Sequence, residues 1–238
     1  MKRNTSIQPT QHPLANCAAA VVRVALALAS PYVFAQQAQV AACGVLAPPG
    51  QYGPYDYRND RDKLPIVDNS HFTPEIEALI PRGNNPVGAD IDYTLRAFPN
   101  HHRALLATVR LGEKLKSPQP YGLRWTIDCY FDRAIRFRPD DAIVRMIFAK
   151  YLNKRSRRPE ALQQLSQAVR LAADGGFTHY NAGLIYLEMQ EYDLAVAEAH
   201  KALSLGFERP ELRDRLMAAG KWKEPPPAPE SAASQSKQ

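Results

Sequence analysis

The segment DYTLRAFPNHHRALL contains the side chains with the clearest capacity for chemistry, the adjacent pair His101 and His102. Asp90 and Asp92 precede the pair, and His71 lies further upstream. Imidazole and carboxylate groups bind transition metals and transfer protons, so these five residues support one hypothesis, a metal-binding protein or an enzyme. Adjacent helical residues, however, project about 100° apart, whereas two helical ligands of one ion need a spacing of three or four residues. We therefore favour a turn with a capping or packing role over a metal or catalytic site.

The rest of the sequence argues against catalysis and against binding of nucleic acid. It has no Gly-rich phosphate loop, no H-E-x-x-H motif and no G-x-S-x-G motif, so we predict no catalytic residue, no cofactor and no resident metal. The 30 basic residues exceed the 24 acidic ones modestly, and part of the excess lies in the first 35 residues, where no acid occurs. The run KRSRR at residues 154–158 is typical of a solvated turn. No basic surface of the kind that nucleic acid requires is expected.

Two segments indicate that the histidine pair belongs to a repeated junction. IDYTLRAFPNHH (residues 91–102) aligns with FDRAIRFRPDDA (residues 131–142) at a shift of 40 residues. Each reads as the end of one helix, a Pro-containing turn and the start of the next helix. We predict Asn100 and Asp140 as the N-caps, because their side chains accept hydrogen bonds from the free N–H groups of a helix start. The two histidines then fall in the first helical turn.

A second periodicity, of 34 residues, extends through the C-terminal half. At this shift small residues recur, pairing Ala149 with Gly183, Ala161 with Ala195, and Ala168 with Ala202. Such a period is typical of tetratricopeptide repeats. The unit HYNAGLIYLEMQEYDLAVAEAHKALSLGF (residues 179–207) resembles this family, and its small and aromatic positions are occupied by Gly183, Tyr186, Tyr192, Ala195 and Ala202. The unit before it departs from the pattern, with Leu152 and Arg158 where the family places aromatics. The resemblance covers roughly residues 88–207.

The resemblance implies an all-α fold, a short tetratricopeptide-like solenoid of helical hairpins over residues 73–220. Thr73-Pro74-Glu75 has the residues of a helix start, a capping hydroxyl followed by Pro and an acid. A capping helix beginning at Pro210 is expected to cover the last repeat. Residues 36–72 are expected to form an extended, loop-rich segment draped over the helices, because residues 44–72 are rich in Pro, Gly, Tyr, Asn and Asp and show no helical period. Residues 221–238 are expected to be a disordered tail.

In this family the first helices of the repeats line a concave groove that holds extended peptides or partner helices. The resemblance therefore implies a protein or peptide partner, bound without catalysis. The implied partner-binding residues are Met146, Lys150, Asn153, Tyr180, Leu184 and Leu187, with Ile143 and Phe177 beside them. Leu184 stands where some family members need a polar side chain to clamp a carboxylate. Two alternatives stay open: several of these side chains are buried in so short a solenoid, or residues 44–72 fill the groove.

The N-terminal residues 1–35 are typical of a signal peptide. Lys2 and Arg3 give a positive start, and a largely apolar stretch covers residues 14–34. Cleavage is expected before Gln36, with a cut after Ala29 as the alternative. No later run of about 18 apolar residues follows, so no membrane span is predicted. The two junction segments together also resemble exported bacterial proteins with such repeats, which implies a periplasmic location.

The cysteines give two readings of the mature N-terminus. Cys17 lies in the expected signal peptide, which leaves Cys43 and Cys129 as a pair that can form one disulfide in an oxidising compartment. Val40-Ala41-Ala42-Cys43 also has the form of a lipobox, which would make the protein a lipid-anchored assembly factor. The polar residues 36–39 just before it favour the disulfide.

Overall fold

A computed structural model describes residues 42–225, and within this range the chain consists of helices joined by turns and loops, without a β-strand. The predicted all-α class is confirmed for these residues. The 3-10 helix η1 (Arg61–Lys63) and α2 (Leu64–Ser70) come first. The other helices are α3 (Pro74–Glu77), α4 (Val87–Ala97), α5 (His102–Leu115), α6 (Ile127–Phe137), α7 (Ala142–Lys154), α8 (Arg158–Ala172), α9 (Gly176–Glu188), α10 (Tyr192–Ser204) and α11 (Pro210–Ala218).

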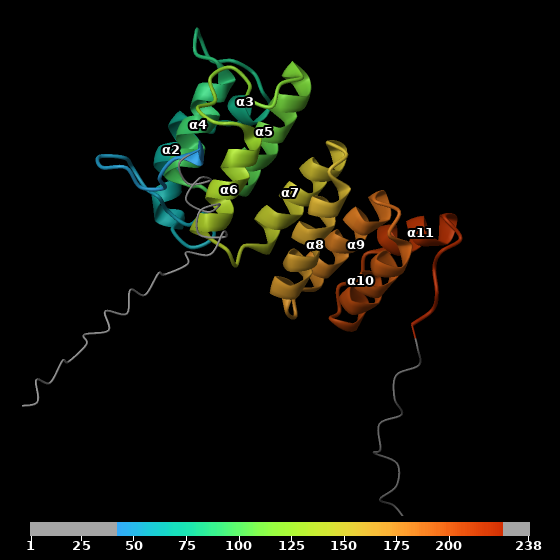
Figure 1. Ribbon diagram of the computed structural model, residues 1–238. Coiled ribbons are helices and arrows are strands. Elements are labelled where there is room, and N and C mark those ends of the chain that lie inside the picture. The colour runs from blue at the N-terminus through green and yellow to red at the C-terminus, as the bar shows by residue number, and fades with distance from the viewer. Residues whose placement is uncertain (1–41, 226–238) are drawn as a thin grey trace, which may run out of the picture.

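Helices of the C-terminal half pack in chain order (Figure 1). α7 lies along α8, α9 lies along α10, and α8 contacts α9. Loops of only a few residues join the helices of each pair, so the two members run antiparallel. α7 and α9, which also contact each other, therefore run in the same direction. α11 packs against both α9 and α10 at the end of this series.

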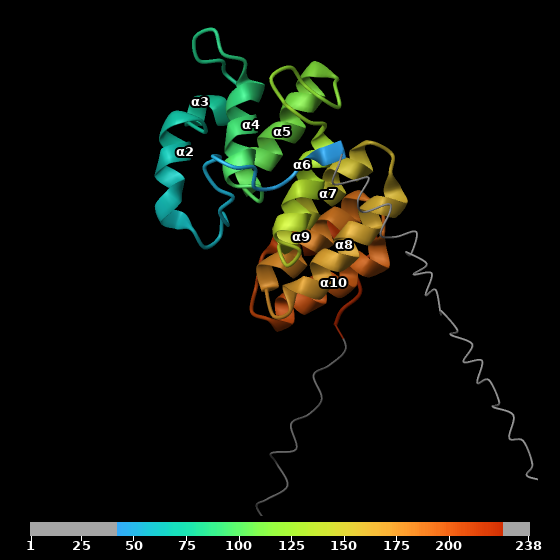
Figure 2. The same cartoon turned by 60° about the vertical axis from the view of Figure 1, so that its left-hand side comes forward.

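The N-terminal half is built around α4, α5 and α6 (Figure 2). α5 contacts α4 and α6 as well as α7, and it thereby joins the two halves. A long loop connects α5 to α6, and its backbone passes close to the start of α4 at Gly88. A Cβ atom at Gly88 would overlap the carbonyl oxygen of Tyr121, so a glycine is needed for this approach. The loop is thus part of the packed structure.

α4 and α6 end in the same way, which agrees with the 40-residue alignment of their sequences. Both helices have 11 residues, and their C-caps, Phe98 and Arg138, have nearly equal φ/ψ angles of −130°/84° and −133°/84°. The N-caps of the helices that follow are His101 and Asp141. They occupy equivalent positions, 40 residues apart. The junction therefore repeats in three dimensions.

The predicted N-caps Asn100 and Asp140 were wrong by one residue. Nδ1 of His101 accepts a hydrogen bond from the N–H of Ala104, at 3.1 Å, and so performs the capping. Asn100 lies in the turn before it and is fully buried, with its side chain bonded to residues outside its own helix. A neutral imidazole is an uncommon cap, and for this reason the preference for Asn misplaced the helix start.

Residues 44–72 are not extended throughout, and this prediction is corrected. Residues 61–70 form η1 and α2, whose inner face buries Leu64 and Val67 at 6% and 0% exposure. The spacing of three residues between Leu64 and Val67 did not indicate a helix in the sequence, because α2 is short and has a proline near its start. Thr73 occupies the N-cap position of α3 as expected, but its hydroxyl makes no capping hydrogen bond, and α3 has only four residues.

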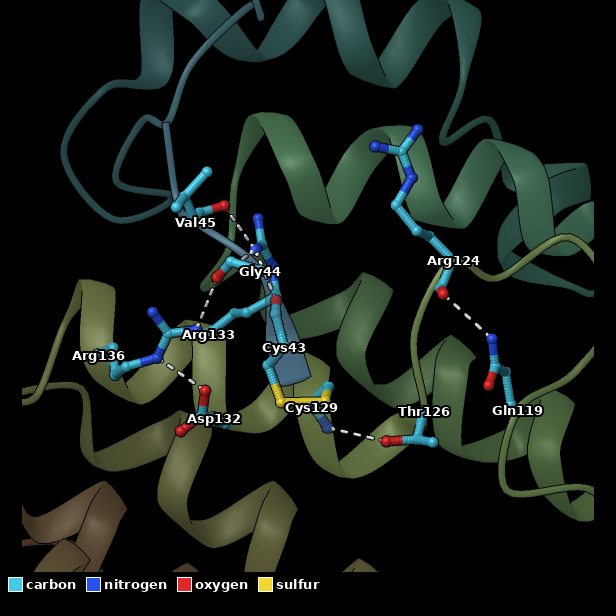
Figure 3. Close-up of a disulfide and its surroundings, with 10 residues drawn as sticks. All are labelled: Cys43, Gly44, Val45, Gln119, Arg124, Thr126, Cys129, Asp132, Arg133 and Arg136. Atoms are coloured by element: carbon cyan, nitrogen blue, oxygen red, sulfur yellow. Dashed lines mark hydrogen bonds and ion pairs between the residues drawn. A yellow bond between two sulfur atoms is a disulfide. The ribbon is translucent and has the colours of Figure 1, made fainter. Parts of the chain in front are cut away.

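A disulfide joins Cys43 to Cys129 of α6, and a buried arginine holds the residues next to it (Figure 3). Nη1 of Arg133 donates to the carbonyl oxygens of Cys43 and Val45 at 3.0 and 2.8 Å. Arg133 is 1% exposed, and the central carbon of its guanidinium lies over the ring of Trp125, 4.0 Å from the ring centroid. Burial lowers the pKa of Arg133 to about 10, and the nearby Arg136 acts in the same direction. A lipid on Cys43 would need the sulfur atom that this disulfide uses.

The predicted signal peptide, both of its cleavage sites and residues 226–238 of the predicted tail lie outside the described residues. Residues 221–225 contain no helix. Among the helices that the structure describes, none is long and apolar enough to cross a membrane.

Candidate functional site

Three neighbouring helices present apolar side chains on one continuous face. Leu106 of α5, Ile143 and Met146 of α7, and Phe177 and Leu184 of α9 line a cavity of about 380 Å³. α5 contacts α7, and α7 contacts α9, so the three helices are neighbours in this order. The spacings of three and seven residues along α7 and α9 place each set on one side of its helix. We call this cavity the groove.

The groove contains five of the residues that the family resemblance implied. Ile143, Met146, Lys150, Phe177 and Leu184 all line it. Phe177 is 55% exposed, whereas Met146 is only 5% exposed and forms part of the floor. The groove therefore has an accessible apolar rim over a buried base. None of residues 44–72 lines it, so the alternative in which that segment fills the groove is not what the structure shows.

The other three implied residues do not line the groove. Leu187 is 8% exposed and packs in the core. Tyr180 lines a different hollow, of about 490 Å³, between α10 and α11, and its ring contacts Phe207. Asn153 is partly exposed near the end of α7. Tyr180 and Leu187 are seven residues apart and share a face of α9 that is turned away from the groove.

Sequence reasoning missed the contributions of α5 and α11. His102 and Leu106 line the groove from α5, and Glu211 and Arg215 line it from α11. The sequence contained a signal for Leu106, because the 40-residue shift that relates the two junctions also aligns Leu106 with Met146. The residues of α11 had none, since they belong to no repeat that the sequence reveals.

The charged side chains around the groove are paired with one another. Nζ of Lys150 lies 3.2 Å from Oε1 of Glu188, and Nη1 of Arg215 lies 3.6 Å from Oε1 of Glu211. The groove wall therefore carries little net charge. The basic run at residues 154–158 is likewise largely neutralised, for example by the ion pair between Lys154 and Glu113 at 2.7 Å.

Beside the groove, a polar cluster around two buried carboxylates connects the N-terminal segment to both repeated junctions. Asp56 and Asp141 are 0% and 1% exposed, and the side-chain amide of Asn100 donates to both, at 2.7 and 2.9 Å. Arg58 donates to Asp56 and, at 2.9 Å, to Asp140. We call this set of five residues the polar junction. Its side chains supply hydrogen-bond partners in the turns that it covers, where the regular backbone hydrogen bonds of a helix are absent.

The two buried carboxylates of the polar junction are held in the ionised form. Burial acts to raise the pKa of Asp56, but hydrogen bonds from Arg58 and Asn100 outweigh it and hold that pKa well below its usual range. The pKa of Asp141 is also lowered, because hydrogen bonding and charge from His102, together with Asn100, outweigh the effect of burial. Hydrogen bonds to the charged form of an acid favour that form.

The five residues of the metal or enzyme hypothesis are divided among different partners. Nδ1 of His71 lies 2.9 Å from Asp90, and the His71 ring stacks on Tyr93. Asp92 accepts hydrogen bonds from Tyr130 at 2.5 Å and from Arg96 at 2.9 Å. The two histidines of the adjacent pair also separate.

His101 is fully buried, and burial lowers its pKa; its Nε2 lies 3.5 Å from Asp68. His102 is partly exposed, and its Nε2 lies 2.9 Å from Oδ2 of Asp141. One ring caps a helix while its neighbour borders the groove.

Within residues 42–225 no group of three or more His, Cys, Asp and Glu side chains is placed to hold a metal ion. The groove has a different capacity, since an apolar concavity with a few polar groups suits a side chain or short segment of another molecule. A scan against protein-family models and a search of curated proteins both find no match to this chain.

Proposed function

We propose that this chain is an exported, tetratricopeptide-like interaction protein that binds a segment of a partner protein in the groove. It acts as a module or scaffold of the bacterial envelope and catalyses no reaction itself. The observation that carries the proposal is the groove, a cavity of about 380 Å³ to which α5, α7, α9 and α11 all contribute. Its size lies in the range of cavities that hold small ligands and single large side chains.

Packing of the small residues supports a solenoid of repeats. The five alanines at the repeating positions are 0–1% exposed, at Ala149, Ala161, Ala168, Ala195 and Ala202. A Cβ atom at Gly183 would lie 2.5 Å from Cδ2 of Leu212, so glycine allows α11 to lie close to α9. Small side chains at helix crossings are what a stack of hairpins needs.

The character of α11 supports a capping role. It buries Leu212 and Leu216, at 1% and 0% exposure, while its charged residues remain exposed. A solenoid needs such a helix because the last repeat would otherwise present an apolar face to water.

The disulfide supports an exported protein. Cystine bonds form and persist in the periplasm and outside the cell, and they are rare in the reducing cytosol. The bond between Cys43 and Cys129 fixes the start of the described chain to α6. Oxidation is therefore expected to accompany folding of this protein in its own compartment.

The proposal is tested by capturing partners with variants whose substitutions lie on exposed side chains. Leu106→Asp combined with Phe177→Asp places two charges on the groove rim, at sites that are 43% and 55% exposed. A matched control combines Leu171→Asp with Leu194→Asp, at sites on α8 and α10 that are 39% and 44% exposed. The first pair lines the groove, and the control pair does not.

The purified variants are cross-linked to an envelope extract, and captured proteins are compared by mass spectrometry. We expect the groove pair to lose at least one partner that both the native protein and the control pair retain. Circular dichroism melts verify that all three proteins are folded. Retention of every partner by the folded groove variant would show that the groove is not the binding surface.

A further inference from the structure

A group of large apolar side chains is exposed at one end of the N-terminal half. Ile80 follows α3 and is 54% exposed, and Leu115 ends α5 and is 49% exposed. Tyr121, in the loop between α5 and α6, is 82% exposed. The loops that join α3 to α4 and α5 to α6 lie at the same end of the molecule in both Figure 1 and Figure 2. Exposed apolar groups that gather in this way mark surfaces that bind another molecule or a membrane.

Contacts between the segments hold these side chains near one another. Nζ of Lys114 lies 3.4 Å from the carbonyl oxygen of Leu79, so the end of α5 adjoins the residue before Ile80. On the other side of α4, the backbone at Tyr121 packs against Gly88, close to the start of that helix. The segments on both sides of the α4 N-terminus are therefore fixed relative to it.

The loop that carries Tyr121 is itself ordered by hydrogen bonds. The side-chain amide of Gln119 donates to the carbonyl oxygens of Leu123 and Arg124, at 3.3 and 3.1 Å (Figure 3). The N–H of Leu123 donates to the carbonyl oxygen of Pro120 at 3.0 Å, and the Leu123 side chain is buried. A fixed loop thus presents the Tyr121 ring to solvent. Such a loop loses little conformational entropy when the ring binds.

The same segments carry an excess of positive charge. Glu113 is the single acidic residue of residues 79–88 and 110–126, and it is paired with Lys154 at 2.7 Å. The basic residues of these two ranges, all of them exposed, are Arg82, Arg110, Lys114, Lys116 and Arg124. We call the two ranges the basic end. Neither range contains a basic run, so only the fold brings these charges together.

Acids beside the basic end neutralise little of this charge. Arg110 donates to the carbonyl oxygen of Glu77, whereas the carboxylate of Glu77 accepts from Arg103 at 2.9 Å. Arg82 donates to a main-chain oxygen, and its charge acts on the exposed Glu75 at the start of α3. The positive excess of the basic end therefore remains after these neighbours are taken into account.

Cations mixed with exposed apolar side chains are complementary to an anionic bilayer surface. Such a surface attracts Lys and Arg, its headgroup region favours Tyr, and its acyl boundary accepts aliphatic groups. A nucleic acid would offer phosphates to the cations but would place Ile80 and Leu115 against a charged backbone. A folded acidic protein would need a hollow shaped to two projecting loops, whereas a fluid bilayer adapts to them.

We propose that the basic end is a docking surface for anionic lipid, with Ile80 and Tyr121 entering the interfacial region and the cations facing the headgroups. The contact is peripheral and does not depend on the proposed function of the groove. α5 has His102 at the groove and Leu115 at the basic end, about 20 Å apart for a helix of 14 residues. A docked protein therefore keeps this part of the groove open to a partner.

The experiment measures flotation of the protein with lipid vesicles. The protein from Gln36 onward is used, so that the apolar residues 14–34 do not contribute. One set of vesicles contains equal parts of phosphatidylglycerol and phosphatidylcholine, and the other contains phosphatidylcholine alone. We expect binding to the first set only. This binding should weaken as the salt concentration rises from about 0.05 M to about 0.5 M, because salt screens exposed charges.

Two double variants separate the charges from the apolar side chains. Lys114→Gln with Lys116→Gln is expected to weaken binding about 30-fold, because each cation near an anionic surface contributes roughly fivefold. Ile80→Ser with Tyr121→Ser is expected to weaken binding at least about fivefold, because less apolar area leaves water.

Matched controls change the same kinds of side chain on the C-terminal half. Lys201→Gln with Lys223→Gln removes exposed cations that are each paired with an acid. Leu194→Ser with Met217→Ser removes apolar side chains that are 44% and 53% exposed. Both controls are expected to bind vesicles as the native protein does. Circular dichroism melts verify that each variant is folded.

A fluorescent reporter tests insertion directly. Tyr121→Trp places an indole at the loop, and brominated phosphatidylcholine in the anionic vesicles is expected to quench its emission. Leu194→Trp is the control, and its added emission is expected to stay unquenched. If a double variant does not fold, the reporter and the salt dependence of the native protein decide.

The inference is overturned if the protein does not bind anionic vesicles, or if either folded double variant binds them as tightly as the native protein. Competition with a polyglutamate peptide and with single-stranded DNA provides a further test. Equal affinity for these polyanions, with no quenching of the reporter at Tyr121, would identify a general polyanion site and refute lipid docking. The groove is judged separately, by the capture experiment with Leu106 and Phe177.

Discussion

Removing the disulfide is expected to destabilise the protein by several kilocalories per mole. The perturbation is Cys43→Ser together with Cys129→Ser, in the chain from Gln36 onward, which is the expected mature form. The bond closes a loop with a sequence separation of 86 residues. In the chain-entropy treatment a loop of 86 residues corresponds to about 4.6 kcal/mol at 25 °C.

A second contribution comes from Arg133. Its buried Nη1 donates to the carbonyl oxygens of Cys43 and Val45, and these partners are held in place by the disulfide. If the segment detaches, a buried cation loses its hydrogen bonds, which costs roughly 1–3 kcal/mol. The two effects overlap, because both describe release of the same segment, so we expect a total loss of about 3–5 kcal/mol.

The assay is equilibrium urea unfolding, followed by circular dichroism, of the oxidised protein, the reduced protein and the serine variant. The reduced protein and the serine variant are expected to have the same free energy of unfolding. Arg133→Met is expected to lower this free energy more when it is introduced into the oxidised protein than when it is introduced into the serine variant. This difference follows because the segment still covers Arg133 only when it is tethered. A total loss below about 1 kcal/mol would refute the reasoning, since it lies far under the loop-closure value.

Three further predictions concern stability. His101→Asn keeps a capping acceptor and removes a buried imidazole whose pKa is lowered. The native protein should lose stability as the pH falls, by at most about 1.4 kcal/mol per pH unit for this one group, because the unfolded chain binds the proton more readily. Urea unfolding at pH 7.5, 6.5 and 5.5 should show a smaller loss for the variant. Gly88→Ala should lower the unfolding free energy by about 1–3 kcal/mol despite better helix propensity, because the methyl meets backbone at Tyr121; a thermal melt checks this. Asp56→Asn should lower the free energy of unfolding by about 3 kcal/mol, because Arg58 loses its buried partner. The native protein loses the stabilisation from the ionised Asp56 as the pH falls below about 4, and the variant should not show this loss. Urea unfolding measures both effects.

Each of these predictions has a contrary outcome. An unchanged pH slope for the His101 variant would mean that this ring is charged in the folded protein. A stabilised Gly88 variant would mean that the loop at Tyr121 moves freely away from α4. A neutral effect of Asp56→Asn would mean that the existing hydrogen bond from Arg58 to Asp140 is enough to satisfy this guanidinium.

The sequence allowed the helical class and the repeated junction to be predicted, because both depend on local patterns. The shift of 40 residues related α4 to α6 correctly, since the same apolar spacing and the same proline-containing turn recur. The N-caps were misplaced by one residue for a tertiary reason. Asn100 is a good local cap, but its side chain is used by Asp56, which lies 44 residues away in sequence.

The groove shows a similar division between local and tertiary information. Residues on one face of α7 were identified because helical spacing fixes which side chains point together. Tyr180 and Leu187 lie outside the groove, because the packing of α10 and α11 decides which face of α9 is covered. Long-range partners of this kind leave no trace in the spacing of a single segment.

The polar junction links the least regular segment of the chain to the surface with the proposed function. Asn100 bridges Asp56 and Asp141, and Asp141 in turn orients His102 at the groove. Each acid has a buried position that only these contacts make tolerable, because an unpaired buried carboxylate is strongly unfavourable. A substitution at Asp56 therefore acts on His102 through the same hydrogen bonds that stabilise the turns. The segment that carries Asp56 lies outside the groove, yet it contributes to the precision with which one groove residue is held.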